Sequence, residues 1–505
     1  MKILHLILAI VLLFGLHFSV GCDKTGNLQN KEFFDENGSN LLLAVSSGGV
    51  AVSQTNPVKR HHDSNYLHTV TSFMDTMIKF GTDRYGEVHS PMLVSILMAD
   101  TLDHPGAKLL PPLKGQRQID RAPFGGNLQH DISLLAAMKH LSNLNGDTKY
   151  LAAADSYLQF FLDNCTDTPT GLWPWGEHAH WNFYTEKPGH KWHEYLGAVP
   201  FSFWEQAWDI NSQAVIAEAD GCLNHVVDLK TFNYNRHADI WQALPDPRPV
   251  NLDIADFPRA GGFYLQLWAF VYAKTGDAKY LDWIERLLDQ QQSRIHRSSG
   301  LLLLTSEWWN SNNPALNSTH SCALSMLESV PLLEKTETAD RVELLALDYL
   351  EAVLQNTPTT GISPSFTSRY GETTLPGMAM MYAHTYRLTG DLRFMGPARM
   401  VAHKYAELER IPDLPYIPAQ VFASIINLLL DINDLEEETI WIEAAERFAR
   451  QAIDLFYYNG IFRGATGLEY YESELWVSNL VYALLRLHCL ISDLDYHVPP
   501  ITFQR

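Results

Sequence analysis

An internal repeat is the feature that most constrains the fold. A Gly-Asp turn between two helical segments recurs in LNGDTKYLAAADSYLQFFLDN (144–164), KTGDAKYLDWIERLLDQQQ (274–292) and LTGDLRFMGPARMVAHKYAEL (388–408). The glycine suits the left-handed conformation that ends a helix, and the aspartate can cap the next helix. Weaker copies near 333–356 and 429–456 fill the intervals. The chain is therefore built from helical hairpins of similar length.

The two helices of each hairpin differ in hydrophobic pattern. The segments before the turn, such as GGFYLQLWAFVYAKTGD (261–277), are apolar on nearly every side, whereas the segments after it are amphipathic. A helix that is apolar all round is buried all round. We therefore predict an all-α protein in which inner helices are ringed by outer ones. Six or seven hairpins between 63 and 492 would form an α/α toroid.

The charge of the chain excludes one class of partner. The formal net charge is −21, so no basic field is available to displace counterions from nucleic acid. An anionic ligand would have to be held by a local positive pocket.

The N-terminus indicates export. Lys2 is followed by the apolar run ILHLILAIVLLFGLHFSV and then by Gly21-Cys22, a pattern that resembles a bacterial lipoprotein signal. We predict a signal over 1–22, a lipid on Cys22 that anchors the protein to a bacterial membrane on the periplasmic side or the cell surface, a polar tether over 23–62, and a toroid domain over 63–497. The other four cysteines form no CxxC pair, and free buried thiols are favoured.

The polar residues of the predicted toroid lie mainly just before its inner helices. In such a fold the inner helices begin at one rim, so these loops converge on one cleft and their helix dipoles favour an anion there. The loops supply His130, His193, Arg259, His320, Arg369, Tyr370, Tyr416 and Glu472.

One of these loops is unusually long and rich in aromatic and histidine residues. GLWPWGEHAHWNFYTEKPGHKWHEY (171–195) connects an outer helix to the next inner one. Four of its histidines, in HxH (178, 180) and HxxH (190, 193), could ligate zinc. No HExxH or aspartate cluster supports that interpretation, and we predict neither a metal nor another cofactor. The loop instead suits a sugar-binding surface over the cleft.

Two carbohydrate chemistries fit these loops. Hydrolysis needs two opposed carboxyls, and no pair stands out among Glu177, Glu194, Glu307, Glu372 and Glu472, with Asp131 behind them. Elimination from a uronate needs a group that neutralises the carboxylate, a base and an acid. Asn, His, Arg and Tyr are abundant in the loops, so elimination fits better.

The exported toroid with these loops resembles the polysaccharide lyases that cleave alginate, glucuronan and related polyuronates. The resemblance implies metal-independent β-elimination of a polysaccharide. We assign the base to His193 or Tyr370, the acid to Tyr370 or Tyr195, and carboxylate neutralisation to Asn182 with Arg369 or His180. The predicted sugar platforms and further substrate contacts are Trp173, Trp175, Trp181, Trp308, His178, Arg259, Glu307 and His320.

Three other functions remain open from sequence. A glycoside hydrolase, including an unsaturated uronyl hydrolase, could use the same scaffold with one of the glutamates. A sugar epimerase could use two histidines as acid and base. A surface glycan-binding lipoprotein would bind polysaccharide through the tryptophans and leave it intact.

Overall fold

A computed structural model describes most of the chain in two compact units, Met1–His62 and Asp63–Arg505. In the first unit it describes the backbone of one antiparallel sheet in the order β1-β2-β3, formed by β1 (Phe33–Phe34), β2 (Asn40–Ser46) and β3 (Gly49–Gln54). The predicted signal and Cys22 lie outside the described residues. In the second unit the structure describes 66–106, 110–111, 113–114, 117–248, 255–306, 313–366, 373–492 and 494–502.

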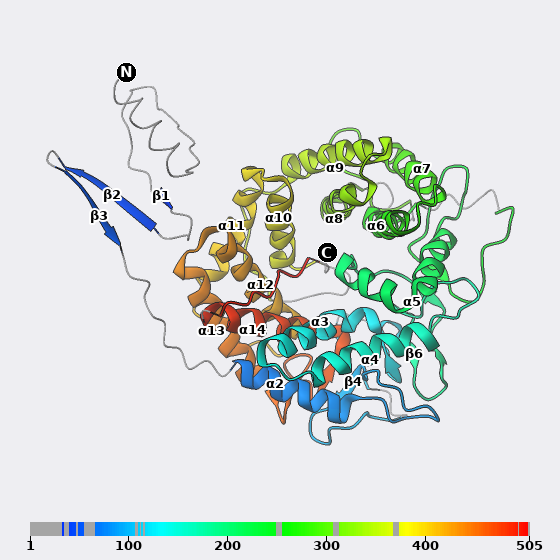
Figure 1. Cartoon of the computed structure of the whole chain (residues 1–505), viewed down its shortest axis with the longest axis horizontal. Coiled ribbons are helices and arrows are strands. Elements are labelled where there is room, and N and C mark those ends of the chain that lie inside the picture. Colours follow the sequence, from blue (N-terminus) through cyan, green and yellow to red (C-terminus); the bar gives the residue numbers. More distant parts are fainter. Residues whose placement is uncertain are drawn as a thin grey trace. The chain divides into compact units, whose positions relative to one another are not determined.

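The second unit consists of helical hairpins, as the repeat predicts (Figure 1). The pairs are α3 (Leu128–Asn145) with α4 (Lys149–Asn164), α6 (Pro258–Thr275) with α7 (Lys279–Ser293), α8 (Leu316–Ser329) with α9 (Glu337–Asn356), α10 (Leu375–Thr389) with α11 (Met395–Ala406), and α12 (Ala419–Glu436) with α13 (Thr439–Phe456). The last inner helix, α14 (Val477–Ile491), packs on α2 (Tyr66–Thr76).

The Gly-Asp turns have the conformation that the sequence predicts. Gly146 ends α3 at φ 75°, Gly276 ends α6 at φ 69° and Gly390 ends α10 at φ 70°. After each glycine, the aspartate side chain accepts a hydrogen bond from the backbone N–H two residues later. The turn therefore ends one helix and starts the next by local chemistry alone.

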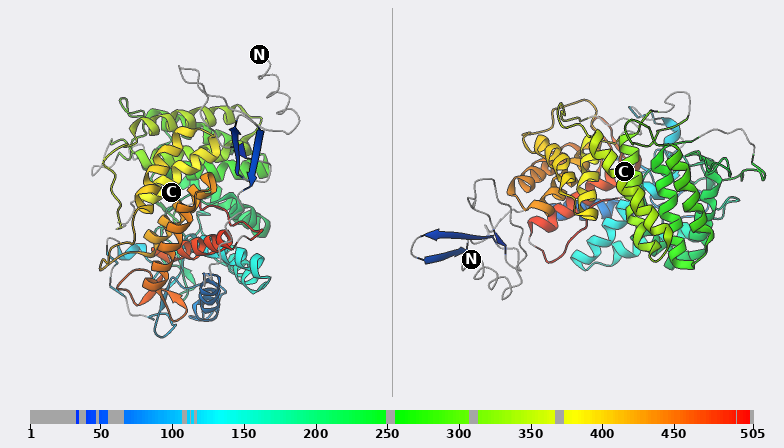
Figure 2. Two further views of the ribbon diagram at one scale, coloured as in Figure 1. Left: turned by 90° about the vertical axis from the view of Figure 1, so that its left-hand side faces the viewer. Right: turned by 90° about the horizontal axis from the view of Figure 1, so that it is seen from above.

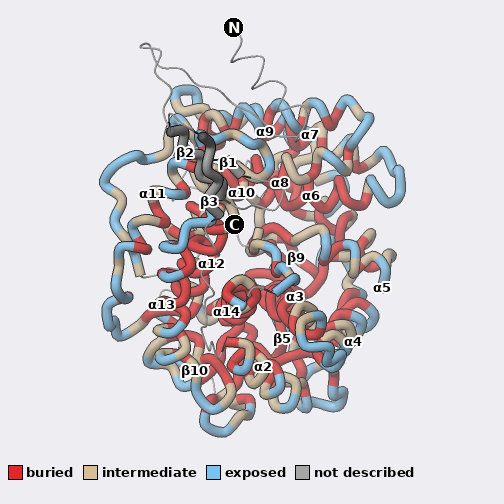
Figure 3. Tube along the Cα trace, turned by 60° about the vertical axis from the view of Figure 1, so that its left-hand side comes forward, coloured by how far each residue is buried: buried red, intermediate tan, exposed pale blue. Residues whose placement is uncertain are grey.

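The inner helices follow one another around a ring. Each of α6, α8, α10, α12 and α14 packs on the next, and α14 packs on α3. Between α3 and α6 lies α5 (Phe201–Gly221), which is kinked at the non-helical residue Asn211 and packs on both α4 and α6. The inner helices are buried over most of their length (Figure 3), and the outer helices cover them (Figure 2). The fold is the predicted α/α toroid.

Short strands tie together the loops that lead into the inner helices. They pair as β4 (Ile96–Met98) with β12 (Tyr470–Glu472), β5 (Gly125–Gly126) with β6 (Trp181–Asn182), β6 with β7 (Lys187–Pro188), and β8 (Trp192–His193) with β9 (Ala238–Asp239). A further hairpin, β10 (Tyr457–Tyr458) with β11 (Ile461–Phe462), follows α13. These pairings hold loops distant in sequence at one rim.

The four cysteines of the second unit are free and buried, as predicted. Among the described residues, no helix has the length and apolar character needed to cross a membrane.

Candidate functional site

Two glutamates and two histidines converge at the rim. One ligand atom from each of Glu177, His178, Glu194 and His237 lies within 4.8 Å of the others. His237 Nε2 is 2.8 Å from Glu194 Oε2 and 3.6 Å from Glu177 Oε2, while His178 Nε2 is 3.5 Å from Glu177 Oε2. The two Nε2 atoms are 3.3 Å apart. We call these four residues the rim cluster.

Three chain segments meet to build the rim cluster. Gly176 forms a parallel bridge with Glu194, and the N–H of Glu177 donates to the carbonyl of Glu194 over 3.0 Å. The β8–β9 pair then places His193 opposite Ala238, which brings Glu194 and His237 together. The cluster is thus held by backbone pairing between loops.

The rim cluster suits a divalent cation. Imidazole nitrogen and carboxylate oxygen together are ligands for zinc, manganese and related ions. His178 Nδ1 lies 3.0 Å from Asp120 Oδ1, so the carboxylate favours the tautomer whose Nε2 lone pair points into the cluster. Glu194 Oε2 is buried, with His237 Nε2 at 2.8 Å and Arg236 Nε at 3.3 Å. The residues fit a cation, contrary to the absence predicted from sequence.

Charge around the rim cluster is nearly balanced by arginines. Arg117 lies 2.6 Å from Glu177, Arg236 lies 3.3 Å from Glu194, and Arg259 lies 3.8 Å from Glu194. Burial, followed by the charge of Glu194, raises the pKa of Glu177 to about 7. Burial also raises the pKa of Glu194. A bound cation would stabilise both carboxylates in their charged form.

His193 and Tyr195 are buried residues outside the rim cluster. His193 Nε2 is 3.0 Å from Glu218 Oε1, and the Tyr195 hydroxyl donates to the same oxygen over 2.5 Å. Their side chains are enclosed, with residue exposures of 0% and 2%. Neither offers a surface that a substrate can touch, so the structure does not support the base and acid roles assigned to them.

His180 and Asn182 serve local structure. The His180 ring is buried with its Nδ1 3.1 Å from the carbonyl oxygen of His178, and burial lowers its pKa to about 4. The Asn182 side-chain oxygen accepts from the N–H groups of Tyr184 and Thr185, which forms a turn. Neither is in the rim cluster, although both lie in the same loop.

The tryptophans of the WPW motif are core residues. Trp173 and Trp175 have no exposed surface, and their ring centroids are 4.8 Å apart beside Trp204. Trp181 is 9% exposed. A fully buried ring cannot stack on a sugar, so Trp173 and Trp175 are not platforms. The abundance of aromatics in this loop reflects packing.

Other predicted site residues are dispersed. Arg259 lies at the edge of the rim cluster, with its side chain 24% exposed. His320 is buried between α8 and α10, where its Nε2 is 2.7 Å from the Thr385 hydroxyl. The remaining four lie outside the described residues: Glu307, Trp308, Arg369 and Tyr370.

Sequence reasoning missed His237 and two rim aromatics. Trp241 is 44% exposed, and its backbone N–H donates to the side-chain carboxylate of Asp239 in β9. Trp192 in β8 is half-buried, lies under the ammonium group of Lys191 at 4.0 Å, and has its ring 6.3 Å from that of His237. No motif marks these residues, because only the strand pairing brings them together.

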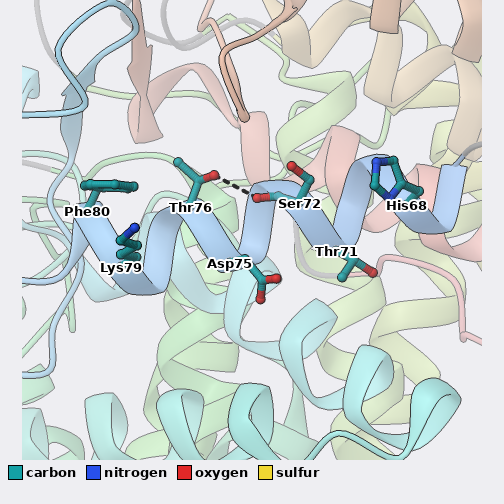
Figure 4. Close-up of a pocket in the computed structure, with 7 residues that line it drawn as sticks. All are labelled: His68, Thr71, Ser72, Asp75, Thr76, Lys79 and Phe80. Atoms are coloured by element: carbon teal, nitrogen blue, oxygen red, sulfur yellow. Dashed lines mark hydrogen bonds between the residues drawn. The ribbon is translucent and has the colours of Figure 1, made fainter.

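A second surface feature is unrelated to this chemistry. A groove runs along α2 and the π-helix η1 (Met77–Gly81) that follows it (Figure 4). All of its lining residues come from this one continuous helical segment: His68, Thr71, Ser72, Asp75, Thr76, Lys79 and Phe80. Side chains from several elements do not converge there as they do at the rim cluster.

Comparison with known proteins places the rim cluster inside a family match. Residues 112–303 match the model of a family described as periplasmic pectate lyase. All four residues of the rim cluster, and Arg117, Arg236 and Arg259, fall within that range. The match covers less than half of the chain and indicates an enzyme that processes polysaccharides.

Solved structures with a similar chain path include three carbohydrate-active proteins. A sugar epimerase from a ruminal bacterium is 12% identical over 69% of this chain and 88% of its own, with a TM-score of 0.44. A GH76 α-mannanase from Bacteroides thetaiotaomicron is 12% identical over 85% and 97%, with a TM-score of 0.41. An unsaturated glucuronyl hydrolase specific for heparin is 13% identical over 86% and 100%, with a TM-score of 0.41.

Proposed function

We propose that this protein is an exported lyase that cleaves a pectate-like polyuronate by β-elimination with the help of a divalent cation. The observation that carries the proposal is the rim cluster, which lies within the segment that matches the pectate lyase family. A cation site bordered by arginines suits a substrate that bears a carboxylate on every ring. The metal-independent reaction expected from sequence is replaced by this proposal.

The rim cluster supplies the means to activate a uronate. A bound cation would neutralise the sugar carboxylate and so acidify the neighbouring C5 proton. Arg117 and Arg259 are partly exposed at the edge of the cluster, with side-chain exposures of 49% and 24%, and would orient the carboxylate. Arg236 is held between Glu194 and Asp256 and would fix the position of Glu194.

His190 is the described side chain best placed to accept the C5 proton. Its ring is half-buried and lies 5.5 Å from the ring of His178. Burial, followed by the nearby His178 and His237, lowers its pKa, so the ring is neutral near pH 7. A neutral imidazole beside the rim cluster can act as a general base. The roles predicted for Tyr370 and Arg369 stay predictions.

Trp241 and Trp192 would form the sugar platform that was predicted for the buried tryptophans. Trp192 lies in β8, and Trp241 follows β9 by two residues, beside the strand pair that carries one side of the rim cluster. Exposed aromatic rings offer apolar faces to sugars. Export through the N-terminal signal, with a lipid on Cys22, belongs to the same proposal and suits an enzyme that acts on an extracellular polymer.

The geometry favours elimination over hydrolysis. A retaining glycosidase places its two carboxyls about 5 Å apart on opposite sides of the scissile bond. Glu177 and Glu194 instead direct their oxygens to one point that two imidazoles share. Such an arrangement suits ion binding better than attack on a sugar from two faces.

Product analysis tests the proposed function. The protein is stripped with EDTA, reloaded with Mn²⁺, Zn²⁺ or Ca²⁺, and incubated with pectate, alginate and glucuronan. We expect metal-dependent ultraviolet absorbance from unsaturated ends, and loss of this signal in His237→Ala but not in His68→Ala, an exposed histidine of the α2 groove. New reducing ends without ultraviolet absorbance would show a hydrolase, and unchanged polymers would show a binding protein. Either result would refute the lyase.

A further inference from the structure

A buried carboxylate lies below the rim cluster and contacts none of its residues directly. Glu218, in the second half of α5, has no exposed surface. Its Oε2 accepts from the backbone N–H of Trp173 over 2.6 Å. Its Oε1 accepts from Trp175 Nε1 over 3.1 Å and from the Tyr195 hydroxyl over 2.5 Å, and lies 3.0 Å from His193 Nε2. Three hydrogen-bond donors and the His193 ring converge on one carboxyl group.

Hydrogen bonds connect Glu218 through His193 and His225 to Asn235. His225 Nδ1 lies 2.9 Å from the carbonyl oxygen of Asn235, which only accepts, so His225 must donate there. A large desolvation effect keeps His225 neutral by lowering its pKa well below the usual value, and its Nε2 is therefore an acceptor. His193 Nδ1, 2.8 Å away, must donate to it. The other His193 nitrogen, Nε2, lies 3.0 Å from Glu218 Oε1, and the indole N–H of Trp175 donates to both atoms over 3.1 Å.

Each branch of this hydrogen-bond network ends beside a residue of the rim cluster. The bonds to Trp173 and Trp175 hold the segment that continues into Glu177 and His178. The bonds to His193 and Tyr195 hold both neighbours of Glu194 in sequence.

The third branch of the hydrogen-bond network runs from His193 through His225 to Asn235. The backbone of Asn235 bonds to His225 at both its N–H and its carbonyl, and its side-chain oxygen accepts the N–H of His237 over 2.9 Å. Glu218 thus reaches all three segments that form the rim cluster.

We propose that Glu218 is the positioning residue of the rim cluster, holding its three segments at the separation that a divalent cation requires. The inference rests on the proposed cation site and adds a residue outside it. Groups that orient metal ligands affect binding by about 10- to 100-fold. His193 links Glu218 to His225 through its two ring nitrogens.

The substitution Glu218→Gln tests this role. A glutamine has one acceptor oxygen, so its amide N–H₂ must face either the Trp173 N–H or the three groups at Oε1. We expect the affinity for Mn²⁺, measured by calorimetry on the full chain, to fall about 10- to 100-fold. At saturating Mn²⁺, kcat on pectate should return to within about threefold of the wild-type value, because the reacting groups are intact.

A second buried carboxylate provides a matched control. Asp431 in α12 is 1% exposed and lies 2.7 Å from Arg486 and 3.4 Å from Arg387. Asp431→Asn should lower the midpoint of thermal unfolding while leaving the affinity for Mn²⁺ unchanged. If Glu218→Gln does not fold, Tyr195→Phe removes a single hydroxyl from the network and should weaken Mn²⁺ binding about threefold or more.

The outcomes separate the two proposals. If the wild-type protein does not bind Mn²⁺, the cation site and this inference both fail. If the wild-type protein binds Mn²⁺ and a folded Glu218→Gln variant, or Tyr195→Phe in its place, binds it equally well, only the positioning role is overturned. If Mn²⁺ affinity falls equally in Asp431→Asn, the effect is general destabilisation, and the positioning role is again overturned.

Discussion

The substitution Gly176→Ala should break the rim cluster from a position that carries no functional side chain. Gly176 has φ 102°, and a Cβ added there would lie 2.0 Å from the carbonyl oxygen of Glu194. Ordinary contact begins at 3.4 Å, so the two backbones must separate by about 1.4 Å, the difference between these distances. Asn127 opposes that movement, because it accepts the N–H of Gly176 and donates to its carbonyl.

The decrease in the free energy of unfolding caused by Gly176→Ala can be calculated from these contacts. Backbone strain at this φ contributes about 1–3 kcal/mol, and each weakened hydrogen bond to Asn127 contributes about 1 kcal/mol. Because two such bonds are weakened, we expect the free energy of unfolding to fall by about 3–5 kcal/mol. Because Glu177 and Glu194 move apart by more than 1 Å, Mn²⁺ affinity and activity should fall on the order of 100-fold.

Urea unfolding and Mn²⁺ calorimetry measure both effects, with Gly146→Ala as the control. Gly146 has φ 75° and nothing within 4 Å of an added Cβ, so it carries strain of about 1–2 kcal/mol without displacing a neighbour. Its Mn²⁺ affinity should equal that of the wild type. The reasoning fails if Gly176→Ala binds Mn²⁺ within twofold of wild type while losing no more stability than Gly146→Ala.

Three further predictions concern different parts of the second unit. Burial raises the pKa of Asp131 to about 8, so the native state holds a proton that the unfolded state has lost, and stability should fall as pH rises from about 4 to 8. Asp131→Asn should flatten this slope in thermal melts, and parallel slopes would contradict it. Trp241→Ala should raise KM for long pectate chains with little change in kcat, whereas the exposed control Leu392→Ala should change neither. His190→Ala should lower kcat by about 10²- to 10⁴-fold without weakening Mn²⁺ binding, and a wild-type rate would remove it as the base.

The sequence predicts the toroid because its turns are specified locally. A glycine in the left-handed conformation and an aspartate cap need no distant partner, so the repeat is visible in the chain itself. The kink of α5 at Asn211 and the short strands of the rim depend on packing and pairing between distant segments. Those features leave no periodic signal to detect.

The candidate site was only partly predictable. The composition of the loop 171–195 predicts that it belongs to the site. His178 was predicted as a substrate contact, and Glu177 and Glu194 were considered as carboxyls of a hydrolase. The sequence missed His237, which lies in another loop and joins them through the β8–β9 pair. It also could not show that Trp173 is buried while Trp241 is exposed, because composition does not reveal which face of a loop meets the core.

The closure of the inner ring has a consequence for how this chain reaches its folded state. α14 packs on both α12 and α3, and it is the last helix described along the chain. Until α14 arrives, α3 and α12 each expose an apolar face that no other inner helix covers. α14 therefore joins the two ends of the ring of inner helices. Its contact with α3 forms slowly, because the two helices are far apart in sequence. Until this helix is in place, the earlier hairpins expose apolar surface and are prone to aggregate, so folding should benefit from a chaperone.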